Sequence, residues 1–180
     1  MIGPYEDGPA ECLPYDPRAA AVAERVAAAI RGLRPDATIE HVGSTAVAGC
    51  DGKGIVDLLV LYVPGTLDEI IEVLDRIGFQ AQTSGNPFPQ ERPMRRGTLV
   101  HDGERFRLHV HVVRAGTEDA VRLVRFRDRL RGDPKLRDAY VAEKRALIET
   151  GVVDTQDYSN AKGGFIRGAV SGMAREGERD

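Results

Sequence analysis

The alternation of apolar and polar residues predicts β-strands in the middle of the chain. The run IVDLLVLY, from Ile55 to Tyr62, is apolar at almost every position, which is typical of a strand covered on both faces. Asp57 interrupts this run, and an unpaired carboxylate in such a place is costly. We therefore expect Asp57 to have a partner supplied by another part of the chain.

Further strands are predicted before the turn Gly43-Ser44-Thr45, near residues 79–82, and in a hairpin that begins at Gly97. Asp102-Gly103 supplies the two-residue turn of that hairpin. The strand after the turn alternates between an apolar face and a polar face. The apolar face consists of Phe106, Leu108, Val110 and Val112, and the polar face of Arg105, Arg107, His109 and His111.

Helices are predicted where apolar residues recur at intervals of three and four positions. The predicted helices cover residues 17–33, 67–77, 117–131, 134–150 and 154–173. Strands in the middle with helices around them predict a mixed α/β protein, α+β in detail. We expect a single domain over residues 1–180, with an irregular arm at about 1–16, a long loop at 84–97 that is either functional or merely solvated, and a polar tail at 174–180.

Composition narrows the classes of function. The net charge is −3, and no basic stripe with interleaved aromatic residues is visible, so nucleic acid is an unlikely partner. No apolar run is long enough for a membrane span, and the N-terminal residues lack the features of a secretory signal. The two cysteines, Cys12 and Cys50, are expected to be free thiols, and a cytoplasmic location is predicted.

The turn Gly43-Ser44-Thr45 is a candidate phosphate site, because glycine lets backbone N–H groups approach an anion and the hydroxyl groups add donors. The alternative is that the hydroxyl residues simply cap a short helix. Asp57, on the strand that follows, could bridge to phosphate oxygens through a metal ion. The alternative is a structural carboxylate paired with a buried cation such as Lys53.

His109 and His111 share one face of a strand and can both reach one ligand or one metal ion. With Asp57 they would make a set of two histidines and one carboxylate, provided that the two strands are neighbours. The alternative is that the pair belongs to a solvent-facing half of the strand, since Arg105 and Arg107 continue the same face.

Each of the last three predicted helices carries one cation on its apolar stripe, at Arg127, Lys144 and Lys162. The two lysines follow Tyr140 and Tyr158 by four positions, so each tyrosine and its lysine share a helix face. Three such cations suggest a basic wall that faces a cleft and suits phosphates. The alternative is that these side chains extend to solvent or form an internal ion pair with Asp57.

Taken together, these residues resemble the GrpB-like family of the nucleotidyltransferase superfamily. The resemblance rests on segments spread over nearly the whole chain: IEHVGSTAVAG from Ile39, GKGIVDLLVLY from Gly52, RLHVHVV from Arg107, RFRDRLRGDPKLRDAYVAEKRAL from Arg125, and YSNAKGGFI from Tyr158. It implies a nucleotidyltransferase-type mixed sheet flanked by helices, with a C-terminal helical region. Ala48 and Gly54 stand where the family tends to have proline.

The resemblance leaves the activity open. Active nucleotidyltransferases usually carry a second aspartate two positions after the first, where this chain has Leu59, and a third carboxylate on a later strand, where this chain has the histidine pair. One hypothesis is an enzyme that transfers a nucleotidyl or phosphoryl group, with Asp57 and Lys53 as catalytic residues. The other is a module that binds a nucleotide or phosphorylated small molecule without turnover.

Both hypotheses allow a divalent metal held by Asp57, His109 and His111. It would be Mg²⁺ or Mn²⁺, or a softer metal such as Zn²⁺ if the histidines are ligands. The phosphate groups would contact Gly43, Ser44, Thr45, Arg127, Tyr140, Lys144, Tyr158 and Lys162. The sequence assigns no oligomeric state.

Overall fold

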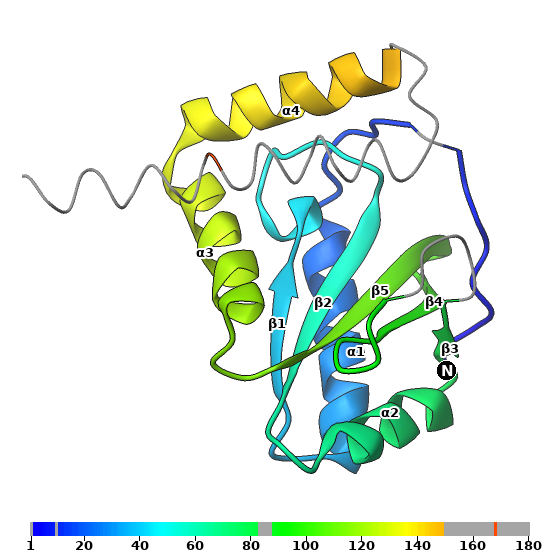
Figure 1. Cartoon of the computed structure of the whole chain (residues 1–180). Coiled ribbons are helices and arrows are strands. Elements are labelled where there is room, and N and C mark those ends of the chain that lie inside the picture. Colours follow the sequence, from blue (N-terminus) through cyan, green and yellow to red (C-terminus); the bar gives the residue numbers. More distant parts are fainter. Residues whose placement is uncertain (1, 10, 83–87, 150–167, 169–180) are drawn as a thin grey trace, which may run out of the picture.

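A computed structural model describes residues 2–9, 11–82, 88–149 and 168 of the 180-residue chain. Its centre is a five-stranded sheet with the strand order β1-β2-β5-β4-β3 (Figure 1). The strands are β1 (Thr38–Val42), β2 (Ile55–Tyr62), β3 (Gln80–Ala81), β4 (Met94–His101) and β5 (Glu104–Arg114). The central pair, β2 and β5, is parallel, and all the other neighbouring pairs are antiparallel. The predicted mixed α+β sheet is therefore confirmed.

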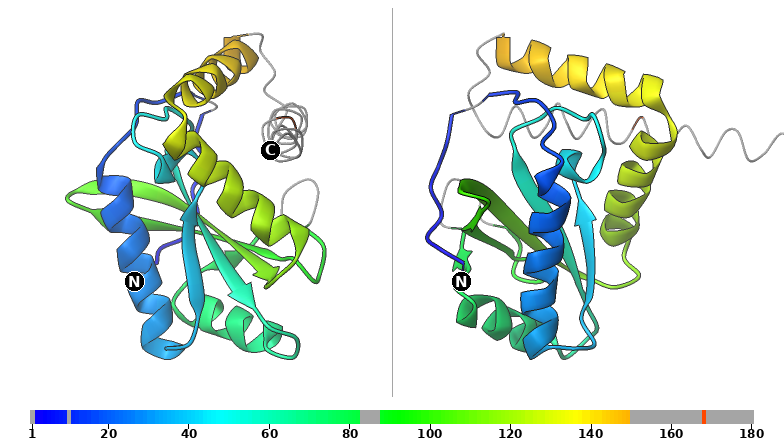
Figure 2. Two further views of the ribbon diagram at one scale, coloured as in Figure 1. Left: turned by 90° about the vertical axis from the view of Figure 1, so that its left-hand side faces the viewer. Right: turned by 180° about the vertical axis from the view of Figure 1, so that it is seen from behind.

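Helices cover both faces of this sheet. The α-helices are α1 (Arg18–Leu33), α2 (Leu67–Arg76), α3 (Glu118–Gly132) and α4 (Pro134–Glu149), and a 3₁₀ turn, η1 (Ser44–Ala46), follows β1. Figure 2 shows α1 and α3 on opposite sides of the sheet. α2 packs on the α1 side, and α4 lies across the end of the molecule beside the connection between β1 and β2 (Figure 1).

β2 is covered on both faces, as its apolar run predicted. On one face, Val56, Leu58 and Val60 are buried in the main core beneath α1 and α2. On the other face, Leu59 is buried in a smaller cluster with Ala120 of α3. Asp57 belongs to this second face, so its carboxylate lies on the α3 side of the sheet.

A third apolar cluster joins α3 and α4 to the connection after η1. It consists of Val47, Cys50, Phe126, Leu130, Tyr140 and Val141. This packing holds α4 over the connection rather than over the sheet, as Figure 1 also shows.

The start of β4 differs from the sequence-based prediction. β4 begins at Met94 rather than Gly97, because Met94 and Arg96 pair with His111 and His109 of the long strand β5. The N-terminal arm has no helix among its described residues but is held by isolated bridges, Gly3 to Thr98 and Leu13 to Gly52. The predicted helix at 154–173, apart from Gly168, and the tail at 174–180 lie outside the described residues.

None of the helices in the described part of the chain is both long and apolar enough to cross a membrane.

Candidate metal and phosphate site

Asp57, His109 and His111 converge on the α3 side of the central parallel pair. Strand register explains why: Asp57 of β2 pairs with His109 of β5, and His111 is the next residue on the same face of β5. Oδ1 of Asp57 is 3.7 Å from Nδ1 of His109 and 3.4 Å from Nε2 of His111. The condition that the two strands be neighbours is therefore met.

This donor set fits a metal ion. One ligand atom from each of the three residues can be chosen so that all lie within 4.8 Å of one another. Ligands at about 2.0–2.2 Å from a shared ion stand roughly 3.0–3.5 Å apart, close to the two measured distances. Two imidazoles and one carboxylate form a set that transition metals and zinc favour over magnesium.

Two aromatic side chains border the histidine pair. The hydroxyl group of Tyr5 lies 3.1 Å from Nε2 of His109, and the two rings are 5.5 Å apart. Phe88 packs edge-on against His111, with ring centroids 5.8 Å apart. Because Tyr5 contacts Nε2, Nδ1 is the nitrogen of His109 that faces Asp57. A histidine that binds a metal commonly has such a second partner on its other ring nitrogen.

The Tyr5 phenol remains protonated at neutral pH. Burial raises its pKa, against the lowering effect of the nearby Arg107 and Arg96 guanidinium groups. The hydroxyl group can therefore donate to His109 or accept from it.

Gly43 packs directly against Asp57. A Cβ atom at this position would lie 2.5 Å from Oδ2 of Asp57, and the backbone has φ +74°. Both facts require glycine here. The predicted turn thus lies beside the predicted carboxylate.

Thr45 serves the fold rather than an open anion site. Its buried hydroxyl group donates to the carbonyl oxygen of Ile55 at 3.0 Å, and Nε2 of His41 lies 3.1 Å from the same hydroxyl oxygen. Since that hydroxyl proton is already used, neutral His41 donates from Nε2. Burial lowers the pKa of His41 to about 4, so the ring is neutral at neutral pH. This arrangement corrects the expectation that the Thr45 hydroxyl faces phosphate.

Ser44 and Lys144 meet at Gly52. A Cβ atom on Gly52 would lie 2.5 Å from the Ser44 hydroxyl oxygen and 3.2 Å from Nζ of Lys144. The Lys144 side chain is only 3% exposed; its ammonium donates to the Asp51 carbonyl, lies 3.6 Å from Cys50 Sγ, and sits 4.4 Å from the Tyr140 ring centroid. Lys144 therefore places a positive charge beneath the turn rather than in an open cleft.

The expected basic wall is not arranged as the sequence suggested. Arg127 is buried and donates to Glu40 at 2.7 Å, to Asp128 at 2.8 Å and to the carbonyl oxygen of His41 at 2.9 Å. The Arg127 guanidinium therefore attaches α3 to β1 through its bonds to Glu40 and His41. Tyr140 is a core residue stacked edge-on against Phe126. The remaining members of the wall, Tyr158 and Lys162, lie outside the described residues.

Lys53 lies half-buried just before β2, and its carbonyl oxygen accepts a hydrogen bond of 2.6 Å from Arg107. The sequence-based prediction did not include Arg107, Arg96 or Tyr5 as site residues. The position of Arg96 was available from the sequence, because a two-residue turn at Asp102-Gly103 pairs Arg96 with His109. No local signal marks Tyr5, which reaches His109 from the distant arm.

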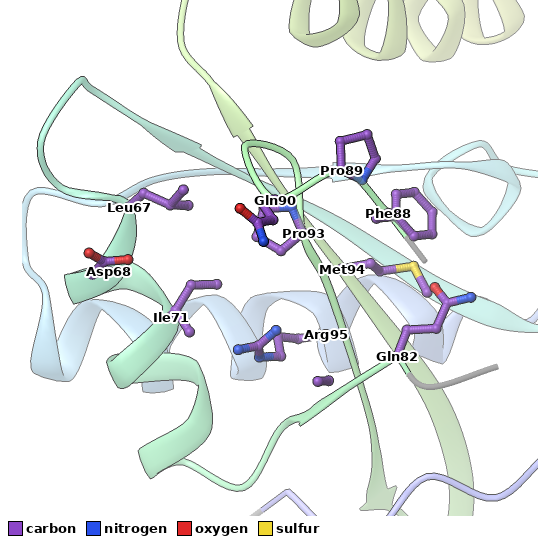
Figure 3. Close-up of a pocket in the computed structure, with 11 residues that line it drawn as sticks. Leu67, Asp68, Ile71, Gln82, Phe88, Pro89, Gln90, Pro93, Met94 and Arg95 are labelled. Atoms are coloured by element: carbon purple, nitrogen blue, oxygen red, sulfur yellow. The ribbon is translucent and has the colours of Figure 1, made fainter. Parts of the chain in front are cut away.

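A cavity of about 290 Å³ lies at the open edge of the sheet, between α2, β3 and the start of β4 (Figure 3). Phe88 and Met94 line it, and both also neighbour His111. Phe88 and Met94 therefore belong both to the lining of the cavity and to the surroundings of His111.

Comparisons with known proteins identify the family. The family model described as GrpB protein matches residues 9–171. A UPF0157 protein of Halalkalibacterium halodurans is 33% identical over 159 residues, which cover 86% of this chain and 77% of the relative. A UPF0157 protein of Pseudomonas aeruginosa is 36% identical over 164 residues, covering 87% of this chain and 64% of the relative.

Comparison with solved structures supports the family assignment and identifies the type of fold. The crystal structure of the conserved protein GrpB from Enterococcus faecalis aligns with a TM-score of 0.70 at 23% identity, covering 91% of this chain and 99% of that chain. Cid1 poly(U) polymerase with bound MgGTP aligns with a TM-score of 0.50 at 17% identity, covering 72% of this chain and 42% of that chain. The chain therefore belongs to the GrpB family and has a nucleotidyltransferase-type fold.

Proposed function

We propose that this protein binds a divalent metal ion through Asp57, His109 and His111, and that the ion holds phosphate groups of a nucleotide or another phosphorylated small molecule. The observation that carries this proposal is the convergence of the three ligating groups directly beside the Gly43 turn. A carboxylate held on a strand next to such a turn is the arrangement that brings a metal and a phosphate together.

The metal ion and several residues of this chain would each contribute to phosphate binding. The ion supplies positive charge to phosphate oxygens when it is bound. Ser44 and the backbone of the turn donate hydrogen bonds, and the buried Lys144 charge beneath Gly52 makes the turn more favourable for an anion. Lys53, just before β2, is the further cation that we assign to ligand binding.

Nucleotidyl or phosphoryl transfer, with Asp57 and Lys53 as the catalytic residues, is the second candidate function. Its support is the similarity of fold to Cid1 poly(U) polymerase and to a cytoplasmic RNA terminal U-transferase. We rank it second because the residue two positions after Asp57 is Leu59, which supplies no carboxylate and is fully buried against α3. Within the described part of the chain, Asp57 is the single carboxylate of the metal cluster.

The test uses the chelator-treated protein with Mn²⁺, Zn²⁺ or Mg²⁺ and each of the four ribonucleoside triphosphates. Saturating ligand should raise the melting temperature by on the order of 5–10 °C. Asp57→Asn should abolish the metal-dependent part of this shift. Asp102→Asn, the same change at the exposed hairpin tip, should leave it intact.

Pyrophosphate release in the same samples separates the two candidates. Stabilisation without release supports the binding module, whereas release that is lost in Asp57→Asn supports transfer. The absence of any metal-dependent stabilisation of the unaltered protein would reject both.

A further inference from the structure

Arg96 has an unusual environment for a charged side chain. It projects from β4 on the same face as His109, its partner in the strand register. The side chain is only 14% exposed, and its Nε atom is buried without a hydrogen-bond partner among the described residues. The guanidinium carbon lies 4.6 Å from the centroid of the Tyr5 ring, which itself contacts His109.

The counter-ion of Arg96 is weakly placed. Nη1 is 3.7 Å from Oδ1 of Asp7, beyond hydrogen-bond distance, and the Asp7 side chain is 89% exposed. A guanidinium removed from water needs charge-assisted hydrogen bonds to offset its lost hydration. A solvated carboxylate on the arm supplies little of this, so the environment of Arg96 favours a better-placed anion.

Arg107 lies beside Arg96 on this face. It is two positions before His109 on β5, and Nη2 donates to the Lys53 carbonyl oxygen. Nη1 borders the arm, where a Cβ atom on Gly8 would come within 2.5 Å of it. The acidic arm thus runs over a basic strip formed by Arg96 and Arg107. Glu6, the residue before Asp7 on the arm, pairs with Arg105.

We propose that Arg96, assisted by Arg107, forms a second anion subsite for a phosphate group, and that the Asp7 carboxylate borders this subsite and competes with the ligand for Arg96. Strand order puts this subsite on the side of the metal cluster opposite to the Gly43 turn, since β1, β2, β5 and β4 are consecutive in the sheet. A ligand that spans both sides must carry more than one phosphate. Resting on the proposed function, this inference narrows the ligand class to polyphosphates such as nucleoside diphosphates and triphosphates.

The test measures binding of inorganic tripolyphosphate and of orthophosphate by calorimetry at low salt, with chelator present and no metal. Arg96→Met should weaken tripolyphosphate binding by about 10-fold or more, because it removes charge-assisted contacts. Arg96→Lys should restore only part of the affinity, since lysine cannot bind an anion in bidentate fashion. Asp7→Asn should strengthen binding several-fold, since it removes the competing carboxylate.

Arg95→Met is the matched control. Arg95 is 13% exposed, nearly the same as Arg96, but it lies on the opposite face of β4 and pairs with Asp75 of α2 at 2.6 Å. Its loss should leave tripolyphosphate binding unchanged. Urea denaturation of each variant checks that the fold is retained.

Equal losses of tripolyphosphate affinity in Arg95→Met and Arg96→Met would overturn the proposal. So would an affinity for orthophosphate as high as that for tripolyphosphate. A failure of the unaltered protein to bind tripolyphosphate would also overturn it. Separate titration with Mn²⁺ or Zn²⁺ alone keeps the two proposals distinguishable. Metal binding that depends on Asp57, together with tripolyphosphate binding indifferent to Arg96, rejects the subsite but not the metal site. The converse result rejects the metal site and retains the subsite.

Discussion

The backbone of Gly43 adopts φ +74° and ψ −173°, a region that is open almost only to glycine. The same residue leaves the space in which Oδ2 of Asp57 lies. One missing side chain therefore permits both the shape of the turn and the contact between the turn and the proposed metal ligand.

At the scale of single residues, we predict that Gly43→Ala lowers the free energy of unfolding by about 1–3 kcal/mol because of backbone strain. The same change should weaken Mn²⁺ or Zn²⁺ binding, because the added methyl group displaces Asp57. Gly65→Ala is the control, because Gly65 also has positive φ, +89°, but has no atom within 4 Å of the added Cβ. Urea denaturation and metal titration of both variants provide the measurement. Unchanged metal affinity in Gly43→Ala would show that the turn does not position Asp57.

At the scale of secondary-structure elements, a short chain of hydrogen bonds connects β1, η1 and β2. His41 of β1 donates to Thr45 of η1, and Thr45 donates to Ile55 of β2. This chain holds the turn between the two strands. Its first member is a titratable group whose neutral form is favoured by burial, and this makes the connection sensitive to acid.

The pH dependence follows from the two pKa values of His41, about 4 in the fold and 6.5 in its ordinary environment. The unfolded chain takes up a proton on this ring before the folded chain does, so the contribution of His41 is fully present above pH 6.5 and is lost as the pH falls toward 4. Burial is the largest cause; Arg131 and Arg127 act in the same direction, and Asp57 opposes them. The full contribution is about 3 kcal/mol.

We therefore predict that His41→Gln, which keeps a donor for Thr45, makes the stability of the protein less dependent on pH between 6.5 and 4. The measurement is urea denaturation of both proteins at several pH values between 6.5 and 4, with unfolding monitored by circular dichroism. His101→Gln, at the hairpin tip, is the control for a histidine change elsewhere. An identical loss of stability in the unaltered protein and in His41→Gln would contradict the prediction.

At the scale of the whole molecule, an apolar cluster and the buried charge of Lys144 help to attach α4 to the connection between β1 and β2. Lys144 crosses this interface and donates to the Asp51 carbonyl oxygen. A helix that lies away from the sheet is thereby coupled to the turn that borders the candidate site (Figure 1).

We predict that Lys144→Met lowers the free energy of unfolding by about 1–3 kcal/mol, because the partly buried Asp51 carbonyl loses its donor. It should also weaken tripolyphosphate binding through loss of the charge beneath Ser44. Lys135→Met, an exposed change on the same helix, should do neither. Denaturation and calorimetry measure the two effects, and equal stability of the two variants would count against a structural role for Lys144.

Periodicity in the sequence predicted the described helices and strands, apart from the start of β4, and the burial of both faces of β2. It could do so because helix and strand patterns are local and reflect which face is buried. It was also sufficient for the facing residues of the hairpin, since a two-residue turn fixes the register. The candidate residues Asp57, His109 and His111 could be named from the same patterns, and the family resemblance supplied the type of fold.

Only the tertiary structure decided what these residues meet. The parallel pairing of β2 with β5 joins segments some fifty residues apart, and no local pattern specifies that register. The same holds for Arg127, whose bonds to Glu40 and His41 depend on how α3 packs on β1, and for Tyr5, which the arm carries to His109. The sequence by itself determined which chemistry was available, and long-range packing determined which groups stand within reach of one another.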